Sequence, residues 1–408
     1  MPNRVSPEGS LRLAYLVSAY PGTSHTFISR EVDALRNLGV AVDTFSIKPA
    51  TKAELADQAL REQANTTFTV RKQPLVTFLS AQVVTLMSRP ARYFWALRRA
   101  LAHRPPGLRP FGMAFIYFAE CLVLARELQR RQITRLHNHF ANAGAITGYL
   151  AAGLLDIPWS FTMHGISETD YPAGLLLGKK IEAASFVACV SYFGRAQAMR
   201  TVTPDQWNKL QVVRCGLPLA ALPKHTGSKS RKRMICVGRL SPEKGQAGLI
   251  DAFASLATEF NDAELIFIGD GPEAESLRAR AAPLADKISF LGRLGEQETL
   301  DEIASSEILV LSSFMEGVPI VLMEAMAVGT AVIATRVAGI PELVEDGNSG
   351  LLFTPSKWDE LANCIRRLLQ DEALRTKLAR NGQKAVAGEF DIDRSASKLS
   401  RLFGGEAS

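Results

Sequence analysis

Residues 313–335 read SFMEGVPIVLMEAMAVGTAVIAT, and this stretch predicts how the second half of the chain folds. A loop leads into a helical run, VPIVLMEAMAVG, and the short apolar run AVIAT that follows is typical of a buried strand. Strands that alternate with helices form a parallel α/β sheet. In such sheets ligands bind outside the carboxyl ends of the strands, so we expect the loop before this helix to face a ligand.

Two glutamates in this stretch, Glu316 and Glu324, have seven residues between them. Glu316 falls in the loop and Glu324 inside the helix, so their carboxylates can lie roughly 12 Å apart along one element. That separation is too large to share a proton or a metal, but it suits the two ends of an elongated, polyhydroxylated ligand. The N–H groups of Gly317, Val318 and Ile320 open the helix, and its positive dipole end favours a phosphate. The stretch therefore predicts a nucleotide-sugar site.

The same alternation runs through the whole chain. LRLAYLVS, TFISREVDALRNLG and VAVDTFSI open it as strand, helix and strand, and it restarts after a polar, basic stretch that contains Gly, Ser and Pro. At 408 residues the chain is long enough for two domains. We expect an N-terminal, acceptor-side Rossmann-like domain over 1–217, a linker over 218–231 and a donor-binding Rossmann-like domain over 232–389. We expect a C-terminal helix, about 390–408, to pack back on the first domain.

Loops with glycine and polar side chains follow four of the predicted strands in the second half. In VGRLSPEKG, Arg239 and Lys244 lie on either side of a turn, and two cations at the carboxyl end of a strand can neutralise a diphosphate without a metal. The other three loops contain Gly269–Glu273, Gly292 and Glu316. Each loop alone could be an ordinary turn, but four on one sheet edge favour a ligand site. No Asp-x-Asp pair stands beside them, so we expect a metal-independent site with no cofactor.

His164 follows the predicted strand WSFTM and precedes Gly165, which places it at the carboxyl end of a sheet. A neutral imidazole there can hydrogen-bond a sugar hydroxyl or a backbone group near the reacting carbon. The alternative is a half-buried histidine that its own loop satisfies. His137 and His139 belong to one strand, and we expect them to point to opposite faces, so that at most one of them lines the ligand site.

The composition is typical of a soluble, cytoplasmic protein. It is 47% hydrophobic and 22% charged, and the five cysteines have no metal-binding or CxxC spacing, so we expect buried, reduced thiols. The N-terminus lacks the pattern of a signal peptide. The longest apolar stretch, near AITGYLAAGLL, is shorter than the ~20 residues that a membrane span needs.

Residues 71–110 hold eight Lys or Arg side chains and no acid, with Tyr93, Phe94 and Trp95 interleaved. This pattern fits either a solvated helix face or a basic amphipathic helix that contacts an anionic membrane or an anionic acceptor. No nucleic-acid recognition motif accompanies it, so we expect no nucleic-acid partner. The second interpretation predicts peripheral attachment to the inner face of a membrane.

Five stretches of the second half resemble the retaining glycosyltransferases of glycosyltransferase family 4, which have the GT-B fold. They are GRLSPEKG, IGDGPE, FLGRL, SSFMEGVPIVLMEAMAVGTAVIAT and VAGIPELVEDGNSGLLF, and they follow the family's order over residues 232–353. The resemblance implies two doubly wound Rossmann-like domains that face each other across a cleft. It also implies that Arg239 and Lys244 hold the donor diphosphate, that Glu316 contacts the transferred sugar and that Glu324 contacts the ribose.

The first half resembles the bacterial exopolysaccharide and colanic-acid-type members of this family. AYPGTSHTFISRE is similar to their YPxxSETFI opening, but His25 stands where they have glutamate, so a role for that position does not carry over. HNHFAN and FTMHGISETD resemble the family's histidine segments, and the Pro21–Thr23 loop would border the acceptor and the diphosphate. The resemblance implies catalytic roles for His164, Glu316, Arg239 and Lys244. The donor-binding residues that it implies are Gly22, Gly238, Arg239, Lys244, Arg293, Leu294, Glu316, Gly317, Val318, Pro319, Ile320 and Glu324.

We therefore expect a retaining transferase that moves a sugar from a nucleotide diphosphate donor to a carbohydrate acceptor, which we expect to be a lipid-linked oligosaccharide. A glycosidase is disfavoured, because its two carboxyl groups lie about 5 to 9 Å apart across the bond. Two alternatives stay open: a nucleotide-sugar epimerase with the same fold, and a two-lobed binding protein without turnover.

Overall fold

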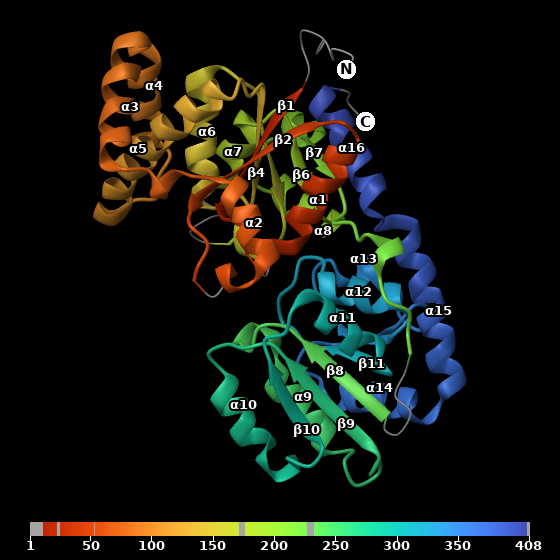
Figure 1. Ribbon diagram of the computed structural model, residues 1–408. Helices are drawn as coiled ribbons and strands as arrows, with labels where there is room; N and C mark the ends of the chain where they lie inside the picture. The colour runs from red at the N-terminus through yellow and green to blue at the C-terminus, as the bar shows by residue number, and fades with distance from the viewer. Residues whose placement is uncertain (1–10, 23–24, 53, 171–175, 227–231, 406–408) are drawn as a thin grey trace, which may run out of the picture. The chain divides into compact units, whose positions relative to one another are not determined.

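The computed structural model, drawn in Figure 1, describes residues 11–22, 25–52, 54–170, 176–226 and 232–405. These residues divide into two compact units. The first contains the described residues up to Val213 and those from Ser395 onward, and the second is Arg214–Arg394. Each unit is built on a parallel sheet, which confirms the predicted α/β class with two Rossmann-like domains. Thr23 of the predicted ligand loop and residues 227–231 of the predicted linker lie outside the described residues.

The first unit contains a seven-stranded sheet in the order β3-β2-β1-β4-β5-β6-β7, and every pair of neighbouring strands is parallel. The chain starts in the middle, winds out to β3, then returns to β4 and winds the other way, which makes the sheet doubly wound. The strands are β1 (Arg12–Ala19), β2 (Ala41–Lys48), β3 (Phe68–Thr69), β4 (Arg135–His139), β5 (Trp159–Met163), β6 (Val187–Cys189) and β7 (Leu210–Val212). The helices are α1 (Thr26–Asn37), α2 (Gln58–Thr66), α3 (Leu75–Ser88), α4 (Pro90–Ala102), α5 (Leu108–Arg130), α6 (Ala143–Leu155), α7 (Leu177–Ala183) and α8 (Tyr192–Met199).

The sequence of β1 explains its central place. Residues 13–17 are all buried, as expected for a continuous apolar run that helices cover on both faces of a parallel sheet. Helix α1 is instead amphipathic, because Ile28, Val32 and Leu35 recur at helical spacing and are buried. Gly39, with φ of +85°, takes the left-handed turn between α1 and β2.

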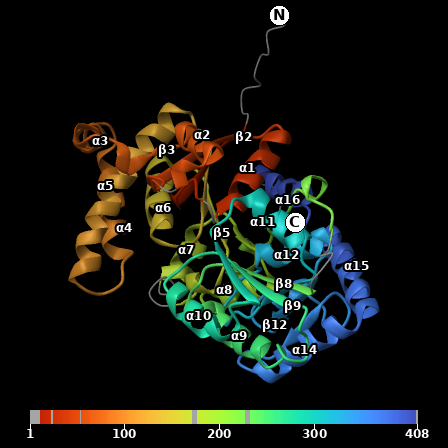
Figure 2. The ribbon, with the colours of Figure 1, turned by 60° about the horizontal axis from the view of Figure 1, so that its bottom comes forward.

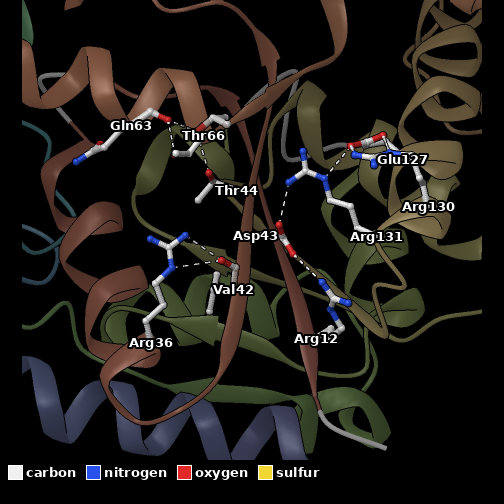
Figure 3. Close-up of polar contacts among 11 residues, drawn as sticks. Arg12, Arg36, Val42, Asp43, Thr44, Gln63, Thr66, Glu127, Arg130 and Arg131 are labelled. Carbon is white, nitrogen blue, oxygen red and sulfur yellow. Dashed lines mark hydrogen bonds and ion pairs between the residues drawn. The ribbon is translucent and has the colours of Figure 1, made fainter. Parts of the chain in front are cut away.

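A polar network fixes the end of α5 to β2 (Figure 3). Arg131 donates from Nη1 to Asp43 Oδ1 at 2.8 Å and from Nε to Glu127 Oε1 at 2.7 Å. Arg12 lies 3.9 Å from the other oxygen of Asp43. The Arg131 side chain is 21% exposed and that of Asp43 26% exposed, so these ion pairs are partly shielded from solvent.

Helices α3, α4 and α5 form a layer next to α6, and both Figure 1 and Figure 2 show them grouped together. α5 packs against α3, α4 and α6. It is also the one helix of the described residues that is long and apolar enough to cross a membrane, judged by length and composition. In this structure 44% of its apolar window is buried. The sequence had instead indicated the region of α6 as the longest apolar stretch.

The second unit contains a six-stranded parallel sheet in the order β10-β9-β8-β11-β12-β13. The strands are β8 (Lys232–Val237), β9 (Ala263–Ile268), β10 (Ile288–Gly292), β11 (Ile308–Leu311), β12 (Ala331–Thr335) and β13 (Leu351–Phe353). The helices are α9 (Gln246–Ala254), α10 (Ala274–Ala281), α11 (Glu296–Ala304), α12 (Ile320–Val328), α13 (Ile340–Leu343), α14 (Trp358–Gln370) and α15 (Glu372–Glu389). The opening stretch thus forms a loop, then α12, then β12, as its pattern predicts.

The last helix, α16 (Ile392–Gly404), carries residues of both units. At its start, the Ile392 N–H donates to the Leu217 carbonyl at 3.1 Å, within the second unit. Near its end, Phe403 is buried in the first unit, with its ring centroid 5.2 Å from that of His137 and 5.4 Å from that of Phe186. The final residues of α16 therefore complete the core of the first unit.

Candidate functional site

The second unit brings two of the predicted site residues into direct contact. Lys244, in the loop after β8, donates from Nζ to Glu316 Oε1 at 2.7 Å. The Ser313 hydroxyl donates to the same oxygen at 2.6 Å. The side chains of Lys244 and Glu316 are 24% and 9% exposed, so the ion pair lies at the surface end of a largely buried carboxylate.

The loops that carry this pair are joined backbone to backbone. The Phe314 N–H donates to the Glu243 carbonyl at 2.8 Å, and the Ser312 hydroxyl donates to the Lys244 carbonyl at 3.0 Å. Gly245 has φ of +64°, and a Cβ there would lie 2.4 Å from the Ser312 carbonyl oxygen. Only glycine allows this approach, so Gly245 is what permits the loop after β8 to pack against the loop after β11.

The remaining two loops join the same edge of the sheet. The Leu240 N–H donates to the Asp270 carbonyl at 3.1 Å, and the Gly269 N–H donates to the Gly292 carbonyl at 2.7 Å. Gly238 and Gly269 have φ of +156° and +132°. A Cβ on Gly269 would lie 2.0 Å from the Gly238 carbonyl oxygen, so glycine at position 269 permits the close approach of the two backbones, whereas at position 238 it is the positive φ that favours glycine. All four loops singled out in the sequence therefore meet at the carboxyl ends of β8, β9, β10 and β11.

The two arginines of these loops extend outward. Arg239 is exposed, and its carbonyl accepts a hydrogen bond from Gln246 Nε2 at 2.8 Å. The Arg293 side chain is 69% exposed, with Nε 3.7 Å from Asp270 Oδ2, and Leu294 beside it is half-buried. Both guanidinium groups thus belong to the edge where the four loops meet.

Helix α12 begins two residues later than its pattern predicted. Its first helical residue is Ile320, and Pro319 takes the N-cap position, with its carbonyl accepting from the Leu322 N–H at 3.1 Å. Gly317 and Val318 therefore belong to the loop rather than to the helix. Pro319 explains why Val318 stays outside the helix, because the residue before a proline is disfavoured in the helical region, and Pro319 itself has an extended ψ of 121°. Glu324 lies inside α12 as predicted, and it is buried, with 8% exposed.

In the first unit, His164 lies directly after β5, as predicted. Its Nε2 is 2.9 Å from Nδ1 of His139, and its ring centroid lies 4.8 Å from that of Phe27 and 4.6 Å from that of Phe140. Burial, followed by the influence of His139 and its histidine neighbours, holds the pKa of His164 well below its ordinary value. This imidazole is therefore neutral at pH 7.

Glu168, which the sequence interpretation missed, holds the His164 loop in place. Its Oε2 accepts from the N–H groups of His164 at 2.5 Å and Gly165 at 2.9 Å, and its Oε1 accepts from the Ala141 N–H. Lys180 donates from Nζ to the Ala141 carbonyl on the same segment. An acid three residues after a glycine is the spacing of a side chain that caps its own turn, and this signal could have identified Glu168.

The prediction that His137 and His139 point to opposite faces of the sheet is wrong. The two residues are separated by one position on β4, and a strand repeats every two residues, so both side chains lie on the same face. Their ring centroids are 5.3 Å apart, and Tyr15 packs against both. His137 bonds the hydroxyls of Ser160 and Thr162 through its two ring nitrogens, each at 2.8 Å.

Glu31, His137 and His139 are the one group of potential metal ligands that comes together in the described residues, with ligand atoms within 4.8 Å of one another. Both nitrogens of His137 already bond hydroxyl groups, so a metal would have to displace one of them. Glu31 likewise accepts the Tyr15 hydroxyl at 2.6 Å. The three side chains therefore fit a hydrogen-bonded network better than a metal site.

Gly22 lies in the loop after β1. Its carbonyl accepts from the His25 N–H at 2.9 Å, and a Cβ on Gly22 would lie 3.0 Å from Glu54 Oε1 and 3.1 Å from His25 Nδ1. The close packing accounts for glycine at this position. His25, at the position where the resembling proteins have glutamate, caps no helix N–H with its side chain, and burial lowers its pKa.

The loops of the second unit lie in the part of the chain that matches a known protein family. Residues 221–385 match the family described as Glycosyl transferases group 1. One curated relative is N-acetyl-alpha-D-glucosaminyl L-malate synthase from Bacillus anthracis, 29% identical over 69% of this chain and 77% of that protein. Another is alpha-D-kanosaminyltransferase from Streptomyces kanamyceticus, 30% identical over 45% of this chain. The match spans only 48% of the length of that second protein.

Solved structures show the same fold over nearly the whole chain. HepE from Anabaena, in complex with UDP, has a TM-score of 0.74 at 18% identity and covers 97% of this chain and 100% of its own. Sucrose-phosphate synthase from Thermosynechococcus elongatus has a TM-score of 0.71 at 21% identity and covers 97% of this chain and 98% of its own. The two parallel-sheet units have the fold of the GT-B glycosyltransferases, and the matched family and the curated relatives support a transferase enzyme.

Proposed function

We propose that the chain transfers a sugar from a nucleotide diphosphate donor to a carbohydrate acceptor with retention, without a metal or other cofactor, as the family 4 enzymes that it resembles do. The observation that carries the proposal is the contact of Lys244 with Glu316 where four glycine-containing loops meet. Support for a nucleotide donor also comes from HepE, which was solved with UDP and with UDP-glucose.

The pair has a simple chemical use. In the structure the Lys244 ammonium neutralises the largely buried Glu316 carboxylate. A donor diphosphate would replace Glu316 as the partner of Lys244, and Glu316 would then be available to a sugar hydroxyl. The diphosphate gains charge as the glycosidic bond breaks, so Lys244 and the exposed Arg239 would stabilise the transition state more than the ground state.

Metal-independent transfer agrees with the groups at this edge. The Asp-x-Asp pair of the sequence, Asp391 and Asp393, serves α16 instead, because Asp391 Oδ1 accepts from the N–H groups of Asp393 and Arg394 at 2.8 and 3.3 Å. Cationic side chains would therefore supply the charge that a metal supplies elsewhere. We assign Gly238, Arg293, Leu294, Gly317–Ile320 and Glu324 to the donor as well, with Gly22 and His164 contributed by the first unit.

A surface of the first unit suits a lipid-linked acceptor. Twelve of the eighteen large, exposed hydrophobic side chains of the described residues belong to α3, α4 and α5. On α3, Leu75, Leu79, Val83 and Met87 follow one another at helical spacing and are 57–80% exposed. Apolar side chains exposed in such number mark an interaction surface. We call this set the α3–α5 face; its other members are Val76, Val84, Leu86, Phe94, Leu108, Phe111, Phe115 and Ile116.

We propose that the α3–α5 face rests on an anionic membrane at its cytoplasmic side. Residues 71–110 carry eight cations and no acid; Arg71 and Arg92 pair with Glu120 and Asp156, and the other six cations complement lipid phosphates. A second copy of the chain would place like charges opposite one another, so self-association through this face is disfavoured. Apolar side chains surrounded by Lys and Arg are the arrangement of proteins that lie on a bilayer without crossing it. The enzyme would thus meet a lipid-linked oligosaccharide where its carrier is held.

The transfer itself is tested by turnover. A thermal-shift screen of UDP-, GDP- and ADP-sugars selects the donor, and the labelled donor is then incubated with and without acceptor glycans. We expect Lys244→Ala to reduce kcat by about 10²- to 10³-fold, as for removal of one group that stabilises a developing anion. Lys377→Ala, which alters an exposed lysine on α15, should leave kcat unchanged. Epimerised donor in the absence of acceptor, or donor binding without any turnover, would contradict the proposal.

A further inference from the structure

A pocket of about 380 Å³ lies on the first unit, between α8, β7 and α16, and we call it the α8–α16 pocket. Its lining includes Arg195 of α8, Asn208 just before β7, Val212 of β7 and Lys398 of α16. Small-molecule sites typically measure about 300–1,000 Å³. No acidic side chain is among the described residues that line this pocket, so its charge is positive. Neither His164 nor any predicted donor-binding residue belongs to it.

The packing of α16 fixes the place of two cations. Leu399, Leu402 and Phe403 are buried in the first unit, so α16 cannot turn about its axis without exposing them. Lys398 and Arg401 are three positions apart and therefore lie on the same side of the helix. Lys398 is half-buried and Arg401 is exposed. The apolar packing thus holds these two cations together at the border of the core.

Arg195 adds a third cation from α8. Burial, and then the nearby charges of Arg401 and Arg195, lower the pKa of Lys398. Within the described part of the chain, none of these three side chains forms an ion pair, and Nε of Arg195 is shielded from solvent without a hydrogen-bond partner. Like charges repel at short range, and buried donors without an acceptor are rare in folded proteins. An anion bound in the pocket would offset the repulsion among the cations.

Neutral hydrogen-bonding groups lie beside the cations. β7 is an edge strand of the seven-stranded sheet. The Val213 N–H donates to the Cys189 carbonyl of β6 at 2.9 Å, so the N–H and C=O of Val212, one position earlier, point away from β6. Asn208 is exposed, and its amide can both donate and accept. Sugar hydroxyls match such groups, whereas a simple inorganic anion needs none of them.

We propose that the α8–α16 pocket binds an acidic sugar unit, one with a carboxylate or a phosphate, of the glycan that accepts the transferred sugar. Arg195, Lys398 and Arg401 would pair with the acidic group, and a guanidinium can do so through two parallel hydrogen bonds. Asn208 and the outer edge of β7 would bond the hydroxyl groups. The use of the glycan as an acceptor rests on the proposed function, whereas the binding of an acidic sugar does not.

Calorimetric titration of the full chain measures this binding without turnover. The acidic probes are mannose 6-phosphate and a tetrasaccharide of alternating glucuronic acid and N-acetylglucosamine. Maltotetraose is the neutral probe, and inorganic phosphate is the anion without a sugar. We expect both acidic sugars to bind at low salt and to bind more weakly at high salt, because salt screens exposed charges. The other two probes should bind at least about 10-fold more weakly, since each lacks one of the two sets of partners.

Two variants and one control assign the binding to the pocket. Arg195→Gln combined with Lys398→Gln should weaken the binding of both acidic sugars about 10- to 100-fold, the range for lost hydrogen bonds to a charged group. Lys398→Gln alone, at a half-buried position, is a milder variant and should show part of this loss. Arg200→Gln combined with Lys377→Gln removes two exposed cations outside the pocket, so the net charge changes equally and the affinities should stay those of the wild type.

The binding outcomes decide the proposal. A wild type that binds neither acidic sugar, or folded pocket variants that bind them as tightly as the control, would refute the site. Maltotetraose that binds as tightly as the acidic sugars would show that charge has no part in the site. Inorganic phosphate of equal affinity would show that the sugar has none. Either of these last two results also overturns the proposal.

Transfer assays separate this proposal from the proposed function. With an acidic acceptor, the KM for the acceptor should rise in the double pocket variant, while the KM for the donor stays constant. An unchanged KM for the acidic acceptor would overturn the role of the pocket in acceptor binding. A wild type that binds acidic sugars in the pocket but transfers sugar to no acceptor would refute the proposed function and leave the acidic-sugar site standing.

Discussion

At the scale of single residues, the structure joins side chains that the sequence could only place near one another. Lys244 and Glu316 both follow strands, and the carboxyl ends of parallel strands lie at one edge, so their proximity was predictable. Their direct ion pair was not, because it depends on the close contact that Gly245 allows. The placement of His137 and His139 on one face was, in contrast, predictable, because side chains on a strand repeat every two residues.

Glu168 gives a prediction at this scale. Its carboxylate accepts three backbone N–H groups and is buried, so an amide at this position would set its NH₂ group against at least one of these donors. We expect Glu168→Gln to lower the free energy of unfolding by about 2 kcal/mol, as for a buried group left without its partner. Urea titration measures this change.

The matched control for Glu168 is Glu182→Gln, which alters an exposed glutamate of the same unit. Its free energy of unfolding should stay within about 0.5 kcal/mol of the wild type. Because Glu168 also fixes the backbone of His164, transfer activity should fall in Glu168→Gln and not in the control. Equal stability of the two variants would show that the three hydrogen bonds to Glu168 are not needed for the fold.

At the scale of elements, the sequence predicted that helices and strands alternate in both halves of the chain, because apolar periodicity is a local property. It also predicted the charge of the segment over residues 71–110. The exposed apolar side chains of α3 could not be predicted in the same way. Which side of a helix is covered depends on its neighbours, and here α3 packs against α4 and α5, with Ala81 and Thr85 buried while Leu79 and Val83 stay exposed.

The α3–α5 face gives a prediction for this scale. We expect weaker binding to anionic liposomes, by at least about 10-fold, when serine replaces Leu75, Leu79, Val83 and Met87 together. Full burial of each aliphatic side chain contributes about 1.5–3 kcal/mol of favourable free energy. The four side chains are exposed, so the fold should persist. Sedimentation with liposomes of anionic lipid at low and high salt measures the binding.

Leu291→Ser is the control for this experiment, because Leu291 is an exposed apolar residue of the second unit. It should bind liposomes like the wild type. Failure of the wild type to bind anionic liposomes at low salt would refute the membrane interpretation. A concentration-dependent dimer that the fourfold variant loses would assign the face to a second copy of the chain instead.

At the scale of the whole molecule, five of the six histidines have a lowered pKa, and four of these five belong to the first unit: His25, His103, His137 and His164. Burial, and then Lys180, lowers the pKa of His103 to about 3. The unfolded chain therefore binds a proton below about pH 6.5 that the folded chain does not. Stability is lost as the pH falls from 6.5 toward 3, by up to about 1.4 kcal/mol per pH unit for one histidine.

We accordingly expect His103→Gln to reduce the acid sensitivity of the first unit. Three of the four tryptophans lie in that unit, so fluorescence of a Trp358→Phe background follows its unfolding in urea between pH 7 and pH 4. Between pH 7 and pH 4, the free energy of unfolding should fall less steeply for the protein with His103→Gln than for the Trp358→Phe protein that keeps His103. Parallel curves for the two proteins would contradict the lowered pKa of His103.

The sequence predicted two parallel α/β domains because both halves repeat the same alternation, and the structure confirms them. The pattern of the second half also placed four loops at one sheet edge, and hydrogen bonds between them bear this out. The contacts among Tyr15, Glu31 and His139 could not be predicted from the sequence. These residues are 16 to 124 positions apart and carry no shared motif, so only the folded sheet brings them together.

The path of the chain through α16 has a consequence for how the protein is made. Phe403 belongs to the core of the first unit, although the whole of the second unit precedes it in the chain. A ribosome therefore delivers this core residue only after the second unit has been synthesised. The second unit can therefore fold during translation before the core of the first unit contains Phe403. This is the reverse of the usual order, in which the N-terminal domain folds first.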